Sequence, residues 1–127
     1  MIHIYGIREH LNPIKAQLSD VINQCMVEAL KFPENKRVHR FFPMEAEDFY
    51  VPEGRSASYT AIEISMMQGR SEQSRKALIH LLFARLDREL SISPVDVEIT
   101  ITETPPCNWG FRGMTGDEAR LNYSIKV

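Results

Sequence analysis

The sequence predicts an α+β fold built from a β-α-β unit that occurs twice. Two segments carry apolar residues at the three- and four-residue spacings of a helix, and strand-like segments flank each of them. The apolar positions of the two helical segments align when Pro33 is placed on Pro94, an offset of 61 residues. We therefore expect a single domain over residues 1–127, with pseudo-repeats at about 2–44 and 60–102.

The first unit begins in the stretch MIHIYG, where Ile2 and Ile4 alternate with His3 and Tyr5. This two-residue period is typical of a half-buried strand. Because the strand starts at the chain end, we expect the sheet to bury that end and to leave no room for a leader segment.

A helix and a second strand complete this unit. We expect Asn12 to cap the helix and Pro13 to occupy its first position, since proline lacks the N–H that a first helical turn leaves unpaired. The apolar stripe ends near Phe32. The segment 37–44 then reads as a strand, and the charged, proline-containing segment 45–58 as a loop.

The second unit repeats this order. Residues 60–67 alternate as a strand, and residues 71–90 form a helical stripe that begins with the capping residue Ser71. The segment 95–102 alternates most regularly, with Val95 on the apolar face. One face of the sheet therefore suits two helices, and the other, of mixed character, would meet solvent or another subunit.

This pattern leaves two architectures open. A ferredoxin-like fold has the same β-α-β-β-α-β order and often serves as a small-molecule regulatory module. Alternatively, the two strands of each unit pair in parallel and the halves join across a pseudo-twofold axis. Periodicity alone does not choose between them.

Composition excludes several function classes. A net charge of −2 gives no general attraction to nucleic acid or to an anionic membrane. No segment approaches the ~18 apolar residues of a membrane span, and the start lacks the features of a signal peptide. The two cysteines and four histidines show no metal spacing. We expect a cytoplasmic protein with reduced thiols and with no metal or cofactor.

The stretch 102–119 is dense in special residues. It contains Trp109 and Phe111 among three glycines, with Arg112 next to Phe111. Such a segment is either an aromatic plug over the core or the aromatic wall of a ligand pocket that also offers a cation.

Here the sequence resembles the tautomerase superfamily, and most closely its malonate semialdehyde decarboxylase-like branch. The likeness spans nearly the whole chain, and its most specific parts are GRSEQ (69–73) and NWGF (108–111), supported by PENKR (33–37) and SPVDVEI (93–99). It implies a tautomerase-like fold and a homotrimer with pockets between subunits. It also implies that a strand over 121–127 joins a neighbour's sheet.

The resemblance further implies a small keto or enol carboxylic acid as substrate, and an amino-terminal proline as the usual catalyst. Ile2 occupies the proline position. Methionine removal generally requires a small second residue, so we expect Met1 to remain and to supply a primary amine, displaced by one residue from the family's base. Its unperturbed pKa would be about 7.7–8.0.

This sequence retains only some of the other catalytic and substrate-binding residues that the resemblance implies. Lys36 replaces a water-orienting aspartate, and a lysine cannot act as an acid's negative partner. Gln68 replaces the first of two substrate-binding arginines, and Arg70 retains the second, whose guanidinium suits a carboxylate. Trp109 and Phe111 match the aromatic pair of the pocket wall.

Three functions follow as hypotheses. The first is a protein that binds a keto or enol acid between subunits, with a proline-independent tautomerase or decarboxylase-type activity. The second is a catalytically inactive family member that acts in ligand binding or assembly. The third is a ferredoxin-like small-molecule regulatory module.

Overall fold

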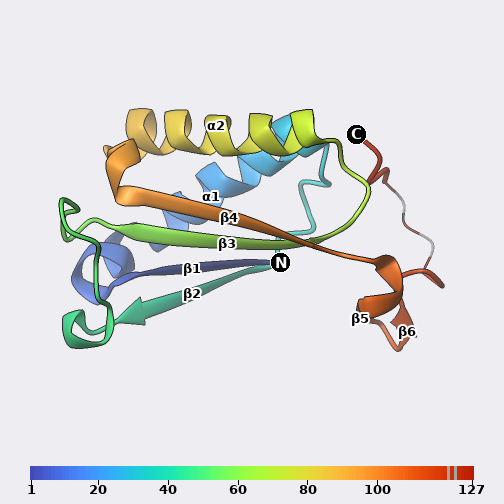
Figure 1. Cartoon of the computed structure of the whole chain (residues 1–127), viewed down its shortest axis with the longest axis horizontal. Coiled ribbons are helices and arrows are strands. Elements are labelled where there is room, and N and C mark those ends of the chain that lie inside the picture. The colour runs from blue at the N-terminus through green and yellow to red at the C-terminus, as the bar shows by residue number, and fades with distance from the viewer. Residues whose placement is uncertain (120, 122) are drawn as a thin grey trace.

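The computed structural model describes residues 1–119, 121 and 123–127. Two strand–helix–strand units follow one another, and a short hairpin comes after them (Figure 1). The first unit comprises β1 (Ile2–Ile7), α1 (Arg8–Leu30) and β2 (His39–Met44), and the second comprises β3 (Thr60–Met67), α2 (Glu72–Leu90) and β4 (Val97–Thr104). The hairpin comprises β5 (Gly110–Phe111) and β6 (Met114–Thr115).

The main sheet has the strand order β2-β1-β3-β4. The two strands of each unit pair in parallel, and β1 pairs with β3 antiparallel. This topology excludes the ferredoxin-like alternative, in which another strand separates the two strands of a unit. Ile2 lies opposite His39 and Thr60 lies opposite Val97, so paired residues are 37 positions apart in both halves. This equal spacing supports the internal repeat suggested by the sequence.

Both helices cover one face of this sheet (Figure 1). The alternate residues Ile2 and Ile4 of β1, with Ile62 and Ile64 of β3, are buried beneath them. Both helices add fully buried residues to this core: Leu11, Leu18, Ile22, Cys25 and Leu30 from α1, and Leu78, Leu82 and Leu86 from α2. The apolar alternation of the strands thus determines which face the helices cover.

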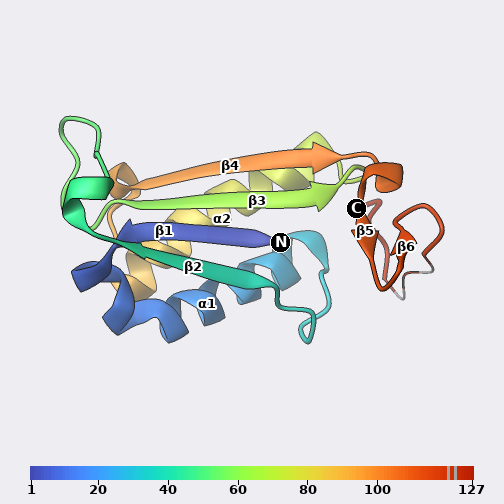
Figure 2. The same cartoon turned by 90° about the horizontal axis from the view of Figure 1, so that it is seen from below.

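The opposite face of the sheet carries an aromatic cluster. The rings of Tyr5 and Phe42 stack with centroids 4.8 Å apart, and His3 lies edge-on to Phe42 at 5.3 Å. No element of the described chain covers this face (Figure 2).

Several expected element boundaries are wrong, and the smallest difference is at β2, which begins at His39 instead of at residue 37. Helix α1 begins at Arg8, not at Asn12, and Pro13 lies inside it. The earlier start places the fully buried Leu11 against Gly6, a contact that local helix signals do not show. By contrast, Ser71 caps α2 as expected, because its Oγ accepts a hydrogen bond from the Ser74 N–H at 3.1 Å.

The fourth strand also begins later than expected. Residues Pro94–Asp96 form a 3₁₀ turn, and Val95 is 52% exposed instead of facing the core. The cause is Asp96, whose carboxylate accepts hydrogen bonds from the Ser56 N–H at 2.8 Å and the Ser56 hydroxyl at 2.6 Å. These bonds hold the turn that directly precedes β4 in the chain.

The end of the chain returns to the start of α2. The Val127 carbonyl accepts hydrogen bonds from the Ser71 N–H at 3.2 Å and the Ser74 hydroxyl at 2.9 Å. The described residues of 121–127 form no strand in the single chain, and Asn122 and Arg120 lie outside the described residues. A strand formed with a neighbouring subunit stays a prediction. Within the described part of the chain, no helix has the length and apolar character to cross a membrane.

Candidate functional site

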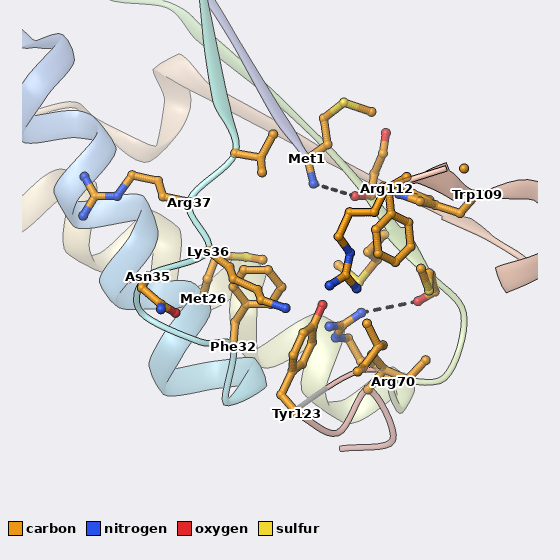
Figure 3. A pocket seen from close by; sticks show the side chains of 18 of the residues that line it. Met1, Met26, Phe32, Asn35, Lys36, Arg37, Arg70, Trp109, Arg112 and Tyr123 are labelled. Carbon is orange, nitrogen blue, oxygen red and sulfur yellow. Dashed lines mark hydrogen bonds between the residues drawn. The ribbon is translucent and has the colours of Figure 1, made fainter. Parts of the chain in front are cut away.

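A cavity of about 610 Å³ opens at the end of the sheet where β1 starts and β4 ends (Figure 3). Its lining comes from the chain start, the segment before β2, the end of β3, the hairpin and the chain end. These segments are far apart in sequence. They meet because the antiparallel pairing of β1 with β3 brings the start of one strand to the end of the other.

The Met1 amine lies at this cavity and is fixed by the sheet. It donates a hydrogen bond to the Ser65 carbonyl at 3.0 Å, and the Ser65 N–H donates to the Met1 carbonyl at 2.9 Å. Burial, followed by the positive charges of Arg40 and Arg70, lowers the pKa of the amine from 8.0 to about 6. The amine is therefore mostly neutral at pH 7 and able to accept a proton.

Arg70 supplies a buried cation to the same cavity. It follows Gly69, whose φ of +144° lies in a region that other residues rarely adopt. Arg70 is 6% exposed, and its Nη1 donates to the Met67 carbonyl at 3.4 Å, while its Nε has no partner among the described residues. Burial lowers the pKa of this guanidinium, and the nearby Tyr123 and Glu103 oppose that change. A buried guanidinium with an unused donor suits an anionic ligand.

Lys36 reaches the cavity from the segment before β2 (Figure 3). Its Nζ lies 4.9 Å from the ring centroid of Tyr123, within the range of a cation–π contact. Phe32 packs edge-on against the same ring, with centroids 5.3 Å apart. Tyr123 therefore connects the Lys36 segment to the end of the chain.

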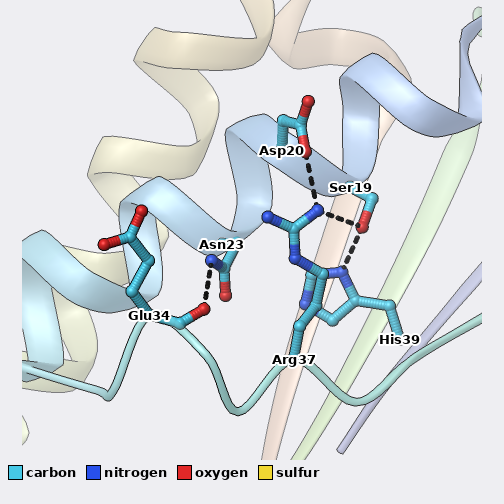
Figure 4. Close-up of polar contacts among 6 residues, drawn as sticks. All are labelled: Ser19, Asp20, Asn23, Glu34, Arg37 and His39. Carbon is cyan, nitrogen blue, oxygen red and sulfur yellow. Dashed lines mark hydrogen bonds and ion pairs between the residues drawn. The ribbon is translucent and has the colours of Figure 1, made fainter.

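A polar cluster holds the Lys36 segment on α1 (Figure 4). The Arg37 guanidinium pairs with Asp20 at 2.6 Å and donates to Ser19 Oγ at 3.3 Å, and Ser19 Oγ lies 2.8 Å from His39 Nδ1. Burial, followed by the charges of Arg37 and the chain terminus, lowers the pKa of His39 to about 4. His39 is thus neutral near pH 7, and the cluster positions the neighbouring Lys36.

Trp109 and Phe111 line the cavity from the hairpin region. The Gly116 N–H donates to the Trp109 carbonyl at 2.6 Å, and Phe111 pairs with Met114 in the hairpin. A side-chain Cβ at Gly116 would lie 2.5 Å from the Pro106 carbonyl oxygen, so only glycine fits this closure. The special residues of this segment therefore build one wall of the cavity.

The structure brings most of the expected site residues together. Those that line the cavity are Met1, Lys36, Arg70, Trp109 and Phe111. Ile2 instead lies in the core at 2% exposure, and Gln68 is exposed and lies outside the lining. The sequence reasoning missed Arg40, Tyr123 and the contribution of Arg112.

The charged side chains among the described lining residues are all cationic. It includes Lys36 and four arginines, Arg37, Arg40, Arg70 and Arg112, of which Arg37 is paired with Asp20. Among the described residues, no aspartate or glutamate lines the cavity. Likewise, no cluster of three or more histidine, cysteine or acidic side chains in the described chain is placed to bind a metal ion. The site is therefore suited to an anion.

Comparison with known proteins agrees with this geometry. The family model for "Tautomerase enzyme" matches residues 36–112. The chain is 26% identical over 100 residues to a probable tautomerase, YusQ, of Bacillus subtilis (strain 168), covering 75% of this chain and 79% of the relative. It is 32% identical over 56 residues to 2-hydroxymuconate tautomerase of Comamonas testosteroni, covering 44% of this chain and 89% of the relative.

Solved structures share the fold at low sequence identity. Malonate semialdehyde decarboxylase superimposes with a TM-score of 0.82 at 21% identity, covering 92% of this chain and 94% of the other. A fused 4-OT, described as an asymmetric trimer, gives a TM-score of 0.81 at 20% identity, covering 91% and 95%. Because the family model covers more than half of the sequence and the fold agrees throughout, this chain belongs to the tautomerase enzyme family.

Proposed function

We propose that this protein binds a small keto or enol carboxylic acid in the cavity and catalyses its tautomerisation with the Met1 amine as the base. One observation carries the proposal: an amine with a lowered pKa and the buried Arg70 line one cavity that has no carboxylate among its described lining residues. The amine accepts protons, and the guanidinium binds the acid group.

The reaction needs only proton movement. Arg70 holds the substrate carboxylate, so that the enol carbon and the enol hydroxyl lie near the Met1 amine. The amine removes the hydroxyl proton, the carbonyl forms, and the resulting ammonium returns a proton to the carbon. No atom is gained or lost. The aromatic side chains of Trp109 and Phe111 form an apolar part of the lining beside this site.

The same site could serve a 3-oxo acid by decarboxylation, since it offers a cationic, partly apolar environment to a developing enolate. The likeness to malonate semialdehyde decarboxylase is one of fold alone, so we place this reaction second. A substrate panel that includes 2-oxo and 3-oxo acids separates the two reactions.

We also propose that the chain forms a homotrimer. The uncovered aromatic face of the sheet and the description of fused 4-OT relatives as trimers support this assembly. Light scattering after size-exclusion chromatography should give three times the chain mass of 14.6 kDa. A monomer would contradict it.

Ketonisation of an enol acid such as enol-phenylpyruvate, followed by ultraviolet absorbance, tests the catalytic proposal. Arg70→Ala should raise KM by about 10- to 100-fold, because a charge-assisted hydrogen bond to the acid is lost. Arg70→Lys keeps the charge and should recover part of this loss. If calorimetry shows binding of the acid but the wild-type rate equals the buffer rate, the protein is a ligand-binding member of the family. Absence of both binding and turnover across the panel would overturn the proposal.

A further inference from the structure

The hairpin that forms the cavity wall turns through an unusual residue. Phe111 pairs with Met114, so the loop between them consists of Arg112 and Gly113 alone. Both have positive φ, +52° and +78°, as a type I′ turn requires. Such turns favour Asn-Gly, Asp-Gly or Gly-Gly, because a Cβ is strained at positive φ and only the short polar side chains of Asn and Asp offset this by local hydrogen bonds. An arginine is therefore a poor choice for the hairpin itself.

The side chain of Arg112 is directed back toward the cavity. Its Cζ lies 4.9 Å from the ring centroid of Phe111, a cation–π contact that holds the guanidinium over the wall. Figure 3 shows the charged ends of Arg112, Arg70 and Lys36 directed toward one part of the cavity, beside the Tyr123 hydroxyl.

The positive charges around Arg112 favour an anion in this part of the cavity. No ion pair involving Arg112 occurs among the described residues, whereas Arg37 on the same lining has the carboxylate of Asp20. Cations directed toward one point repel each other unless an anion lies between them. Two guanidiniums from different elements, one buried and fixed and one on a hairpin, are suited to bind opposite sides of a carboxylate.

We propose that Arg112 is a specificity-determining residue that binds the substrate carboxylate together with Arg70, and that the strained turn is kept for this contact. The inference rests on the proposed function. Arg112 would then supply the second guanidinium of the site from the hairpin. Gln68, at the family's other arginine position, lies outside the cavity lining.

The proposal predicts opposite effects on binding and stability. Arg112→Gly and Arg112→Asn place residues that the turn favours, so the melting temperature should equal that of the wild type or exceed it by a few degrees. Binding of phenylpyruvate, measured by calorimetry, should weaken by about 10- to 100-fold. Binding of its uncharged methyl ester should change less than about threefold, because the ester lacks the full charge that Arg112 contacts. If Arg112 had only a structural role, its substitution would weaken the binding of the acid and of the ester equally.

Two controls complete the experiment. Arg88→Gln removes the same charge from an exposed site outside the cavity and should leave both affinities unchanged. Arg112→Lys keeps a cation and should recover part of the lost affinity. If the wild type binds the acid and Arg112→Gly binds it equally well, Arg112 has no role in binding and this inference fails. If the wild type binds no acid of the panel, the proposed function itself fails.

Discussion

Met1 and Ser65 exchange two hydrogen bonds, which continue the pairing of β1 with β3 by one residue. The Met1 amine donates to the Ser65 carbonyl at 3.0 Å, and the Ser65 N–H donates to the Met1 carbonyl at 2.9 Å. A chain end is usually mobile unless it is fixed in this way. The sheet itself thus determines where the amine lies, beside Arg70 and the aromatic wall.

The pH dependence of catalysis should report this amine. Only the neutral amine accepts a proton, and burial lowers its pKa to about 6. The rate of enol ketonisation, measured as kcat/KM, should therefore rise as the pH increases through about 6 and become constant above about 7. Adding one glycine before Met1 moves the amine out of the ladder and should abolish this transition. A rate that falls between pH 6 and 8 would show that the amine is not the base.

A prolyl amine should function only at the position of Met1. Met1→Pro, produced behind an additional initiator methionine that is removed, keeps Ile2 in the core and places a secondary amine beside Ser65. This variant should fold and retain tautomerase activity. Ile2→Pro instead replaces a side chain that is 2% exposed and should lower the free energy of unfolding by about 2 kcal/mol or more.

Urea denaturation and the ketonisation assay compare these two variants directly. Equal stability of both would contradict the placement of Ile2 in the core. Higher activity of Ile2→Pro than of Met1→Pro would show that the second residue, and not the first, provides the catalytic position.

The fold could be predicted from the sequence because its signals are local. Alternating Ile62 and Ile64 indicate a strand with one buried face, and Ser71 marks the helix start that the structure confirms. The strand order depends on pairing between distant segments, which periodicity does not encode. The sequence does not show the start of α1 at Arg8, because the burial of Leu11 against Gly6 is a tertiary contact.

The candidate site could be predicted only in part, for the same reason. Met1, Arg70 and Trp109 were expected from a resemblance, and the structure places them around one cavity. Tyr123 lies at the cavity because the chain end hydrogen-bonds to the start of α2, and no local sequence pattern shows this connection. Arg112 lies in a segment of unusual composition, but the direction of its side chain depends on the positive φ of the turn.

Acid should destabilise the protein through His39. Its pKa is lowered from 6.5 in the unfolded chain to about 4 in the folded state. Between these values the unfolded chain binds more protons than the native one, so stability falls as the pH decreases from about 6.5. Urea denaturation at pH 7 and pH 5, above the range in which most carboxylates titrate, should show this loss.

His39→Gln provides the comparison, since glutamine can still hydrogen-bond to Ser19 but does not titrate. The difference in stability between pH 7 and pH 5 should be smaller in this variant than in the wild type. An equal difference in both proteins would show that His39 is protonated as readily in the folded state as in the unfolded chain.

The closure of the cavity wall should depend on Gly116. A Cβ at this position would lie 2.5 Å from the Pro106 carbonyl oxygen and 2.8 Å from Met67 Cε. The carbonyl belongs to the backbone and cannot rotate away, so Gly116→Ala should cost about 1–3 kcal/mol in the free energy of unfolding. It should also shift the fluorescence of Trp109, the only tryptophan, because the Gly116 N–H bonds to the Trp109 carbonyl.

Gly110→Ala is the matched control in the same hairpin: its Cβ would meet nothing closer than 4.0 Å, so stability and fluorescence should stay near those of the wild type. Equal effects of the two substitutions would mean that the hairpin is not closed at Gly116.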